Sequence, residues 1–234
     1  ASIDTWAVFV QDEWSATDAL TITAGLRQYA VDAKLDDTDR ASLTAGKIGD
    51  DHQLIGALGM VFDYSDSLRL RTNISQGYVY PSLMQLAAGA YAGSSYVNPS
   101  ADLKAETSVN YEAGLRLQDG GLSLDATAFY TTSDDYIHHL PCKAEDMCPG
   151  RRDQIYQNVG QSNAHGVELF AQYTLPNTAL TPYANATWMK RKNEYVDFST
   201  WDSGVPELSG KLGLRWAGDM WALQALWADF LLDW

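Results

Sequence analysis

The sequence predicts an all-β fold in which about ten antiparallel strands, joined in up-and-down order, form a segment of a larger transmembrane β-barrel. Apolar and polar residues alternate with a period of two along almost the whole 234-residue chain, which is typical of strands with two different faces. The expected strands are about 10 to 15 residues long, whereas strands of globular proteins favour about 5 to 6. Their connections alternate strictly between short and long, as in barrels with tight turns at one end and longer loops at the other.

The alternation places the strands in order along the chain. In the fourth, Leu68, Leu70 and Ile74 share one face, and Arg69 and Arg71 share the other. The expected strands cover 3–14, 19–31, 52–64, 67–79, 107–118, 121–136, 156–175 with an interruption near Gly160, 179–191, 208–217 and 220–232. Short connections are expected at 15–19, 65–66, 119–120, 176–178 and 218–219, and long ones at 32–51, 80–106, 137–155 and 192–207.

The two faces of the expected sheet differ as a bilayer requires. Aromatic residues lie near strand ends, where a membrane has its interfacial belts: Trp6, Trp14, Tyr64, Tyr78, Tyr111, Tyr130, Tyr173, Trp188, Trp216 and Trp221. The polar faces are charged enough for a wet lumen: Arg27, Arg69, Arg71, Glu112, Arg116, Asp125, Glu168, Lys211 and Arg215. The apolar faces would then meet outer-membrane lipid and lipopolysaccharide. A soluble β-sandwich also has alternating strands, but strand length, aromatic positions and lumen charge oppose it.

Composition excludes two classes of protein. The chain has 16 Lys and Arg against 30 Asp and Glu, a formal charge of −14, which opposes binding to nucleic acid. The longest apolar stretch, Leu54 to Phe62, is less than half of the roughly 20 residues that a transmembrane helix needs. The first residues also lack the features of a signal peptide.

The order of the connections predicts where the two chain ends lie. The first strand ends in a short turn and the last begins at one, so both ends are expected on the extracellular side with the long loops. Complete barrels of this kind have even strand numbers, and their termini normally lie on the periplasmic side, opposite to the side expected here. Residues 1–234 are therefore expected to be an interior part of a single, larger barrel domain, which does not close a pore alone.

Cys142 and Cys148 lie in a short polar run, CKAEDMC, within a long connection. Secreted cysteines meet an oxidising compartment, and a loop of this length can bring their Cα atoms within bonding reach. We expect a disulfide at the tip of a loop, with little effect on the barrel.

The chain resembles the barrel of TonB-dependent outer-membrane receptors in four consecutive runs: DSLRLRTNISQGYVYPSLMQL, NPSADLKAETSVNYEAGLRL, LSLDATAFYTTSDDYI and YQNVGQSNAHGVELFAQYTL. The resemblance implies a 22-stranded barrel that is closed by an N-terminal plug and imports ferric siderophores, haem or cobalamin. It also implies contact with TonB through N-terminal sequence, because the plug and the TonB box are absent from this chain, as are the last strands. Haem receptors of the family tend to carry a histidine ligand in the loop that corresponds to 82–97, which contains none.

No catalytic constellation, resident cofactor or metal site is expected, so the chain is not predicted to be an enzyme. His138 and His139 are adjacent on an extended segment, which should direct them to opposite faces and prevent joint chelation of a metal. His138 is a candidate ligand contact, against the alternative of a solvated loop histidine. His165 is expected to mark a strand irregularity. The acidic residues Asp32, Asp36, Asp37 and Asp39 could attract calcium but lack the EF-hand order, so a solvated acidic loop is favoured.

Loop aromatic residues and cations are the stronger candidates for a binding site. An aromatic face with a phenol hydroxyl suits a flat organic chelate, and guanidinium groups attract an anionic ferric catecholate or hydroxycarboxylate. The candidates are Tyr80, Tyr91, Tyr96, His138, Arg151, Arg152, Tyr156 and Trp201. The alternative for Tyr80 and Tyr156 is that they anchor the bases of the loops.

The expected function is uptake of an iron chelate, a ferric siderophore, by a receptor in the bacterial outer membrane. A haem or cobalamin receptor of the same family and a passive porin are the alternatives. An outer-membrane enzyme would need a nucleophile and a base, and the sequence does not place such a pair.

Overall fold

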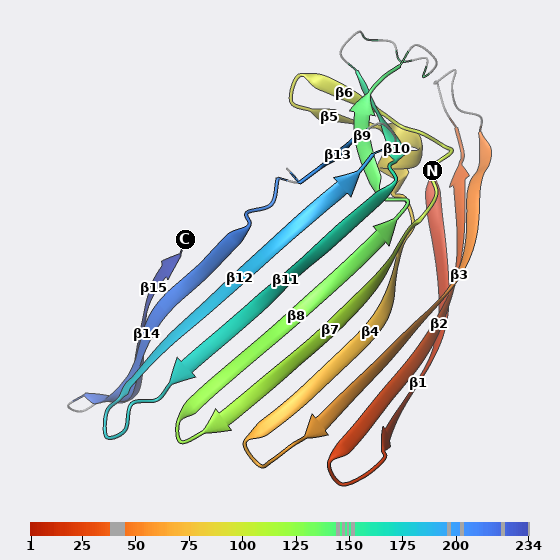
Figure 1. Cartoon of the computed structure of the whole chain (residues 1–234). Coiled ribbons are helices and arrows are strands. Elements are labelled where there is room, and N and C mark those ends of the chain that lie inside the picture. The colour runs from red at the N-terminus through yellow and green to blue at the C-terminus, as the bar shows by residue number, and fades with distance from the viewer. Residues whose placement is uncertain are drawn as a thin grey trace.

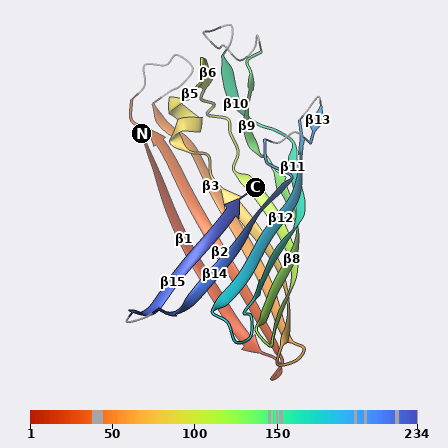
Figure 2. The ribbon, with the colours of Figure 1, turned by 90° about the vertical axis from the view of Figure 1, so that its left-hand side faces the viewer.

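The structure is a computed structural model that describes residues 1–37, 45–143, 146, 148, 150, 153–195, 198–201, 204–220 and 223–233. Its main element is an antiparallel sheet of long strands, tilted and strongly curved (Figures 1 and 2). In sheet order the long strands are β1 (Ser2–Ser15), β2 (Leu20–Leu35), β3 (Gly46–Asp63), β4 (Leu68–Val79), β7 (Glu106–Asp119), β8 (Leu122–Asp134), β11 (Gln161–Tyr173), β12 (Leu180–Glu194), β14 (Leu208–Met220) and β15 (Leu223–Asp233). These ten strands confirm the predicted fold.

The tight connections all lie at one end of the sheet, the lower end in Figure 1. Between β7 and β8, Gly120 and Gly121 have φ angles of 53° and 91°. Two successive positive φ angles are what a two-residue type I′ hairpin turn requires, and glycine reaches them without steric cost. Between β1 and β2 the Thr17 hydroxyl instead accepts a hydrogen bond of 3.0 Å from the Leu20 amide.

The long connections lie at the other end and contain short elements that the alternation did not predict. These are the π-helical turn η1 (Met84–Ala88) with β5 (Ala90–Ala92) and β6 (Ser95–Asn98), then β9 (Ile137–Pro141) and β10 (Gln154–Asn158), and finally β13 (Ser199–Thr200). The strand predicted over 121–136 ends at Asp134, because Asp135 turns the chain with a φ of 54°. The predicted interruption near Gly160 is confirmed, since β10 ends at Asn158 and β11 begins at Gln161.

The prediction that 32–51 forms a loop is wrong at both of its ends. β2 continues to Leu35 and β3 begins at Gly46, and the two remain paired from Leu20↔Phe62 to Leu35↔Gly46. The register shifts once, between Ala33 and Lys34. The extra residue is Ile48 of β3, and a bulge changes which face the following side chains take, so it hides the period-two pattern of β3. The alternation of β2 continues to Leu35.

The two faces of the sheet divide as predicted. Large apolar side chains stand exposed on one face, among them Leu26, Leu58, Ile74 and Tyr111. The other face carries Arg71, Arg116, Asp125 and further charged residues. Within the part of the chain that the structure describes, no second sheet covers the apolar face, which contradicts the sandwich alternative. Among the same residues, no helix is both long and apolar enough to cross a membrane.

The sheet is open in Figure 2, with β1 at one edge and β15 at the other, as predicted for a segment that does not close a pore alone. The N-terminus lies at the end of the sheet that has the long connections, as the order of the connections predicted (Figure 1).

A small hydrophobic core sits where the long connections meet the sheet. Ala33, Leu86, Leu103 and Ile137 are buried there, and Tyr80 is among the partly buried residues that pack against them. Side chains of the long strands face outward or into the lumen, so a dry core can form only where loops fold back over the strand ends. This core fixes the base of the candidate site.

Candidate ligand-binding lobe and lumen wall

A second sheet stands above the long strands, in the order β5-β6-β10-β9. We call β5, β6, β9 and β10, together with η1, the lobe. It is built from two connections that are separate in sequence, 80–105 and 135–160. β6 and β10 join them in parallel through Val97↔Gln154 and Asn98↔Ile155. The two connections therefore fold together into one sheet.

Two asparagines join the halves of the lobe. Asn98 is 7% exposed, and its amide donates a hydrogen bond of 3.1 Å to the Gln154 carbonyl oxygen. Asn158 accepts a hydrogen bond of 2.8 Å from the Lys104 amide and donates one of 3.0 Å to the Lys104 carbonyl. It also donates to the Asp135 carbonyl at 2.5 Å. Neither asparagine was among the predicted site residues.

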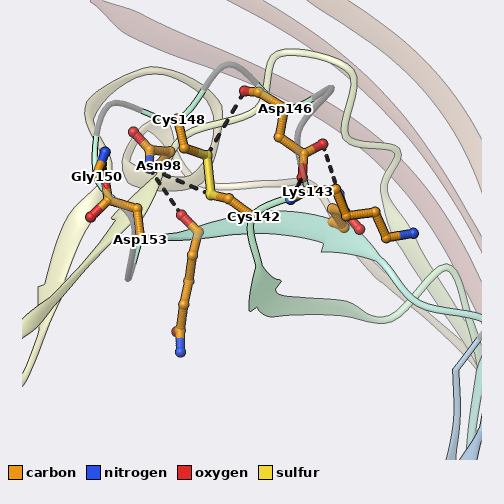
Figure 3. The surroundings of a disulfide bond; sticks show 9 residues. Asn98, Cys142, Lys143, Asp146, Cys148, Gly150 and Asp153 are labelled. Atoms are coloured by element: carbon orange, nitrogen blue, oxygen red, sulfur yellow. Dashed lines mark hydrogen bonds between the residues drawn. A yellow bond between two sulfur atoms is a disulfide. The ribbon is translucent and has the colours of Figure 1, made fainter.

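The disulfide between Cys142 and Cys148 is confirmed, with Cα atoms 6.3 Å apart. Figure 3 shows it beside Asn98, whose Nδ2 lies 3.9 Å from the Cys142 sulfur. The Cys142 amide donates to the Asp153 carbonyl at 3.0 Å, which continues the β9–β10 pairing up to the bridge. The bridge therefore closes the top of the β9–β10 hairpin and lies against β6.

Tyr91 and Tyr96 face one another across the β5–β6 hairpin, with ring centroids 5.1 Å apart in an edge-on arrangement. Tyr91 is 81% exposed. The Tyr96 hydroxyl donates a hydrogen bond of 2.5 Å to the Ala88 carbonyl, which ties the ring to the end of η1. The pair presents an aromatic edge and a phenol group to solvent.

Tyr80 and Tyr156 lie lower and pack, partly buried, against the hydrophobic core. Burial raises the pKa of Tyr80, and the carboxylates of Asp51, Asp50 and Asp32 raise it further. The Tyr80 phenol therefore stays protonated at neutral pH. This arrangement favours the alternative reading of both residues as anchors of the loop bases.

The prediction that His138 and His139 point to opposite faces is wrong. Their ring centroids lie 4.7 Å apart, and the ring planes meet at 21°. β9 is the edge strand of its sheet, so rings can turn toward its free side without meeting a paired neighbour. Burial and the neighbouring His139 lower the pKa of His138. In the described part of the chain, no group of three His, Cys, Asp or Glu residues could hold a metal ion.

Trp201 lies away from the Tyr91–Tyr96 hairpin in sequence and contacts the long strands. It is 53% exposed and stands edge-on to His165, with centroids 6.1 Å apart, while Trp188 stands edge-on to the same histidine at 5.7 Å. The predicted irregularity at His165 is wrong, because β11 pairs with β8 and β12 through this residue without a register shift.

The two predicted cations of the site, Arg151 and Arg152, lie outside the described residues.

Acidic residues at the ends of β2 and β3, and Asp36 just after β2, form ion pairs. Lys47 lies 3.4 Å from Asp32 and 3.3 Å from Asp50, and the N-terminal amine lies 3.0 Å from Asp36. Asp39 lies outside the described residues. Because these carboxylates pair with cations of the chain, the pairs favour a charged surface segment over a calcium site.

The lumen face carries a network of charged side chains. The alternation predicted that this face is polar, but not which of its residues pair. Arg71 donates to both oxygens of Asp125, at 3.0 and 2.5 Å, and Arg116 donates to the same carboxylate at 2.8 Å. Beside it lies a recess of about 370 Å³, lined by Arg71, Asn110, Glu112, Thr127, Phe129 and Glu168. The network satisfies Asp125 and leaves two carboxylates, Glu112 and Glu168, on the wall of the recess.

Comparisons with known proteins agree with this architecture. The family model "TonB dependent receptor-like, beta-barrel" matches residues 1–233. The pesticin receptor of Yersinia pestis is 28% identical over 176 residues, which cover 73% of this chain and 24% of the receptor. The rhizobactin receptor of Rhizobium meliloti (strain 1021) is 26% identical over 247 residues, covering 95% of this chain and 32% of the receptor. The chain thus spans about a quarter to a third of the length of these curated relatives.

Solved structures show the same fold. The copper transporter OprC superposes with a TM-score of 0.74 at 18% identity, over 92% of this chain and 32% of OprC. The ferric yersiniabactin uptake receptor FyuA from Yersinia pestis superposes with a TM-score of 0.60 at 22% identity, over 93% of this chain and 32% of FyuA. With the family model matching almost every residue and the sheet folded as in these barrels, the chain belongs to the TonB-dependent outer-membrane receptors and forms part of their β-barrel.

Proposed function

We propose that the chain is the ligand-selecting part of an outer-membrane receptor for a ferric siderophore. The observation that carries the proposal is the set of relatives, which include receptors named for rhizobactin and, in Escherichia coli (strain K12), for ferrienterobactin. The ferrienterobactin receptor is 30% identical over 159 residues, covering 61% of this chain and 19% of the receptor. Absence of a histidine from 82–97 supports an iron chelate over haem.

The chemistry of the lobe supports this substrate class. Tyr91 and Tyr96 offer aromatic surface at the exposed edge, and Arg151 and Arg152 are the cations for an anionic ferric chelate. Tyr80, Tyr156, His138 and Trp201 complete the proposed set, with Tyr80 and Tyr156 acting through the position of the loops. The lobe and the other long loops would be extracellular, and the apolar face would contact lipid and lipopolysaccharide.

Transport would depend on sequence outside this chain. We propose that 1–234 are part of a single 22-stranded barrel, and that a plug preceding Ala1 fills the lumen and contacts TonB. The recess with Glu112 and Glu168 suits a basic side chain of such a plug, because two carboxylates attract one guanidinium or ammonium group. Energy coupling would then reach the barrel through the plug.

A binding assay on the full-length receptor tests the substrate class. The probes are ferric enterobactin, a ferric hydroxycarboxylate, haem and cobalamin, with binding followed by quenching of tryptophan fluorescence. We expect at least one ferric chelate to bind more tightly than haem and cobalamin, and Tyr96→Ala with Arg151→Ala and Arg152→Ala to weaken that binding without affecting barrel assembly. Preferential binding of haem or cobalamin would contradict the assignment.

A further inference from the structure

We infer that the lobe acts as one rigid body, and that Asn98, Asn158 and the Cys142–Cys148 disulfide are positioning residues for the Tyr91–Tyr96 pair. The coupling between the two connections is argued from the contacts within the lobe. The role of Tyr91 and Tyr96 in binding rests on the proposed function.

The lower join combines the hydrophobic core, where Leu86 and Leu103 pack with Ile137, with the hydrogen bonds of one side chain. Asn158 ends β10, and its amide contacts main-chain atoms of Lys104 in one connection and Asp135 in the other. It uses both its oxygen and its nitrogen, so an aspartate at this position would lose the two donated bonds. The end of the first connection and both the start and the end of the second are thereby held at one point.

The upper join is the short parallel pairing of β6 with β10. Two residue pairs alone would make a weak ladder, but Val97 is 1% exposed and Asn98 adds its side-chain bond to Gln154. A buried amide that lost this partner would leave an unsatisfied donor, which is costly away from water. The join therefore resists opening more than its length suggests.

The disulfide extends this join to the tip. Cys142 follows β9 directly, its amide bonds to Asp153 just before β10, and its sulfur lies against the Asn98 amide (Figure 3). Asp146, between the two cysteines, accepts a bond of 2.6 Å from the Lys143 amide. The bridge holds β10 in the position in which it can pair with β6.

From β6 the connection to the tyrosine pair is direct. Val97 pairs with Ala90 across the hairpin, and Tyr96 pairs with Tyr91. A Cβ atom built on Gly89 would lie 2.5 Å from the Tyr96 hydroxyl oxygen and 2.6 Å from the Val97 carbonyl oxygen, so the hairpin packs directly on the chain that leaves η1. Leu86 of η1 is 1% exposed in the core below.

As a consequence, a change in one connection should alter the mobility of the other. The disulfide lies in 135–160, but its loss should loosen Tyr91 and Tyr96 in 80–105. A site held in its binding geometry loses less conformational entropy when a ligand arrives, so loosening should weaken binding. A loop that was tied down only locally would not behave in this way.

Hydrogen exchange on the full-length receptor in detergent tests the coupling. We expect reduction of the disulfide to speed amide exchange about threefold or more in 90–98 as well as in 137–141 and 154–158, with reversal on reoxidation and no change in β7 or β8. Faster exchange confined to 137–158 would overturn the inference.

Substitution gives a second, independent arm. Asn98→Leu removes the bond to Gln154 and should speed exchange in 90–98 and in 154–158. The matched control is Asn193→Leu, which removes an equally buried asparagine that accepts a bond of 2.8 Å from Ser162 in the wall of the sheet. The control should leave 90–98 unchanged, and an equal effect of both variants would contradict the inference. If Asn98→Leu does not assemble, the reduction experiment still decides.

Binding of ferric enterobactin separates this inference from the proposed function. Where the chelate binds, reduction should weaken binding about threefold to tenfold, and reoxidation should restore it. Coupled exchange without binding of any ferric chelate would refute the proposed function and leave the rigid lobe standing. Tight binding of the chelate, with faster exchange confined to one connection, would refute the inference that the lobe is one rigid body. The proposed function would then still hold.

Discussion

The amide of Asn98 donates a hydrogen bond of 3.1 Å to the carbonyl oxygen of Gln154, a residue 56 positions further along the chain. This bond crosses from one long connection to the other, and it lies beside the disulfide. Through it, two loops that look independent in the sequence form one sheet above the mouth of the barrel. Four predictions follow from this arrangement and from the lumen wall below it.

Gly89→Ala should disturb the tyrosine pair. Gly89 has a φ of 72°, and an added Cβ would meet the Tyr96 hydroxyl and the Val97 carbonyl. Strain and overlap together should cost about 1 to 3 kcal/mol locally. Gly93→Ala is the control, because Gly93 also has a positive φ, 62°, but faces open space. Exchange rates in 90–98 should rise far more for Gly89→Ala; equal effects would show that backbone strain alone matters.

Replacing both Cys142 and Cys148 with serine should leave the barrel intact. Neither cysteine lies in a long strand, and the long strands pair without the bridge, so they should keep their hydrogen bonds. Heat-modified mobility on gels should be unchanged, while protease cleavage within 135–160 should become faster. Loss of barrel assembly in the double variant would contradict this expectation.

Asp125→Asn should destabilise the lumen wall. Arg71 and Arg116 both donate to this carboxylate, so the variant leaves two guanidinium groups facing each other without their common anion. We expect a loss of about 1 to 2 kcal/mol, because the pairs are partly exposed to water. Asp63→Asn breaks the single, more exposed pair with Arg69 and should cost clearly less, because water screens that pair. Denaturant unfolding of the receptor in micelles measures both, and equal losses would refute the shared role of Asp125.

The lobe should loosen in mild acid. Burial, with His139 close by, lowers the pKa of His138, so the unfolded lobe binds a proton more readily than the folded one. Stability is therefore complete above the ordinary histidine pKa of about 6.5 and is lost as the pH falls toward the lower pKa of the folded lobe. Tyr136 and Tyr195 also contact the His138 ring. His138→Gln should remove much of the pH dependence of exchange in 137–141, and an unchanged profile would contradict the role of His138.

The long strands could be predicted from the sequence because each has two environments that alternate along it. Leu68 to Val79, for example, shows its apolar and charged faces directly. The sequence also predicted the disulfide, because Cys142 and Cys148 are the only two cysteines and lie close together. The end of β3 was missed because the extra residue Ile48, opposite Ala33 and Lys34, breaks the alternation. The end of β2 was within reach of the pattern, since Val31, Ala33 and Leu35 continue the alternation as buried residues.

The lobe could not be predicted, for reasons that are physical. β5, β9 and β10 have three to five residues each, too few for a period to be seen. The β6–β10 pairing depends on a contact between distant segments, and its key side chains, Asn98 and Asn158, are of a type that is common in any loop. The stacking of His138 on His139 depends on the free edge of β9, which only the sheet order reveals.

Energised uptake is the measurement that tests the central claim most directly. The full-length receptor is expressed in cells that lack their own siderophore receptors, and accumulation of ⁵⁵Fe is followed with ferric enterobactin and a ferric hydroxycarboxylate. We expect uptake of at least one chelate that requires both TonB and the proton-motive force, and that falls when Tyr96, Arg151 and Arg152 are replaced by alanine. Uptake that continues equally when the proton-motive force is abolished would contradict it and identify a passive pore.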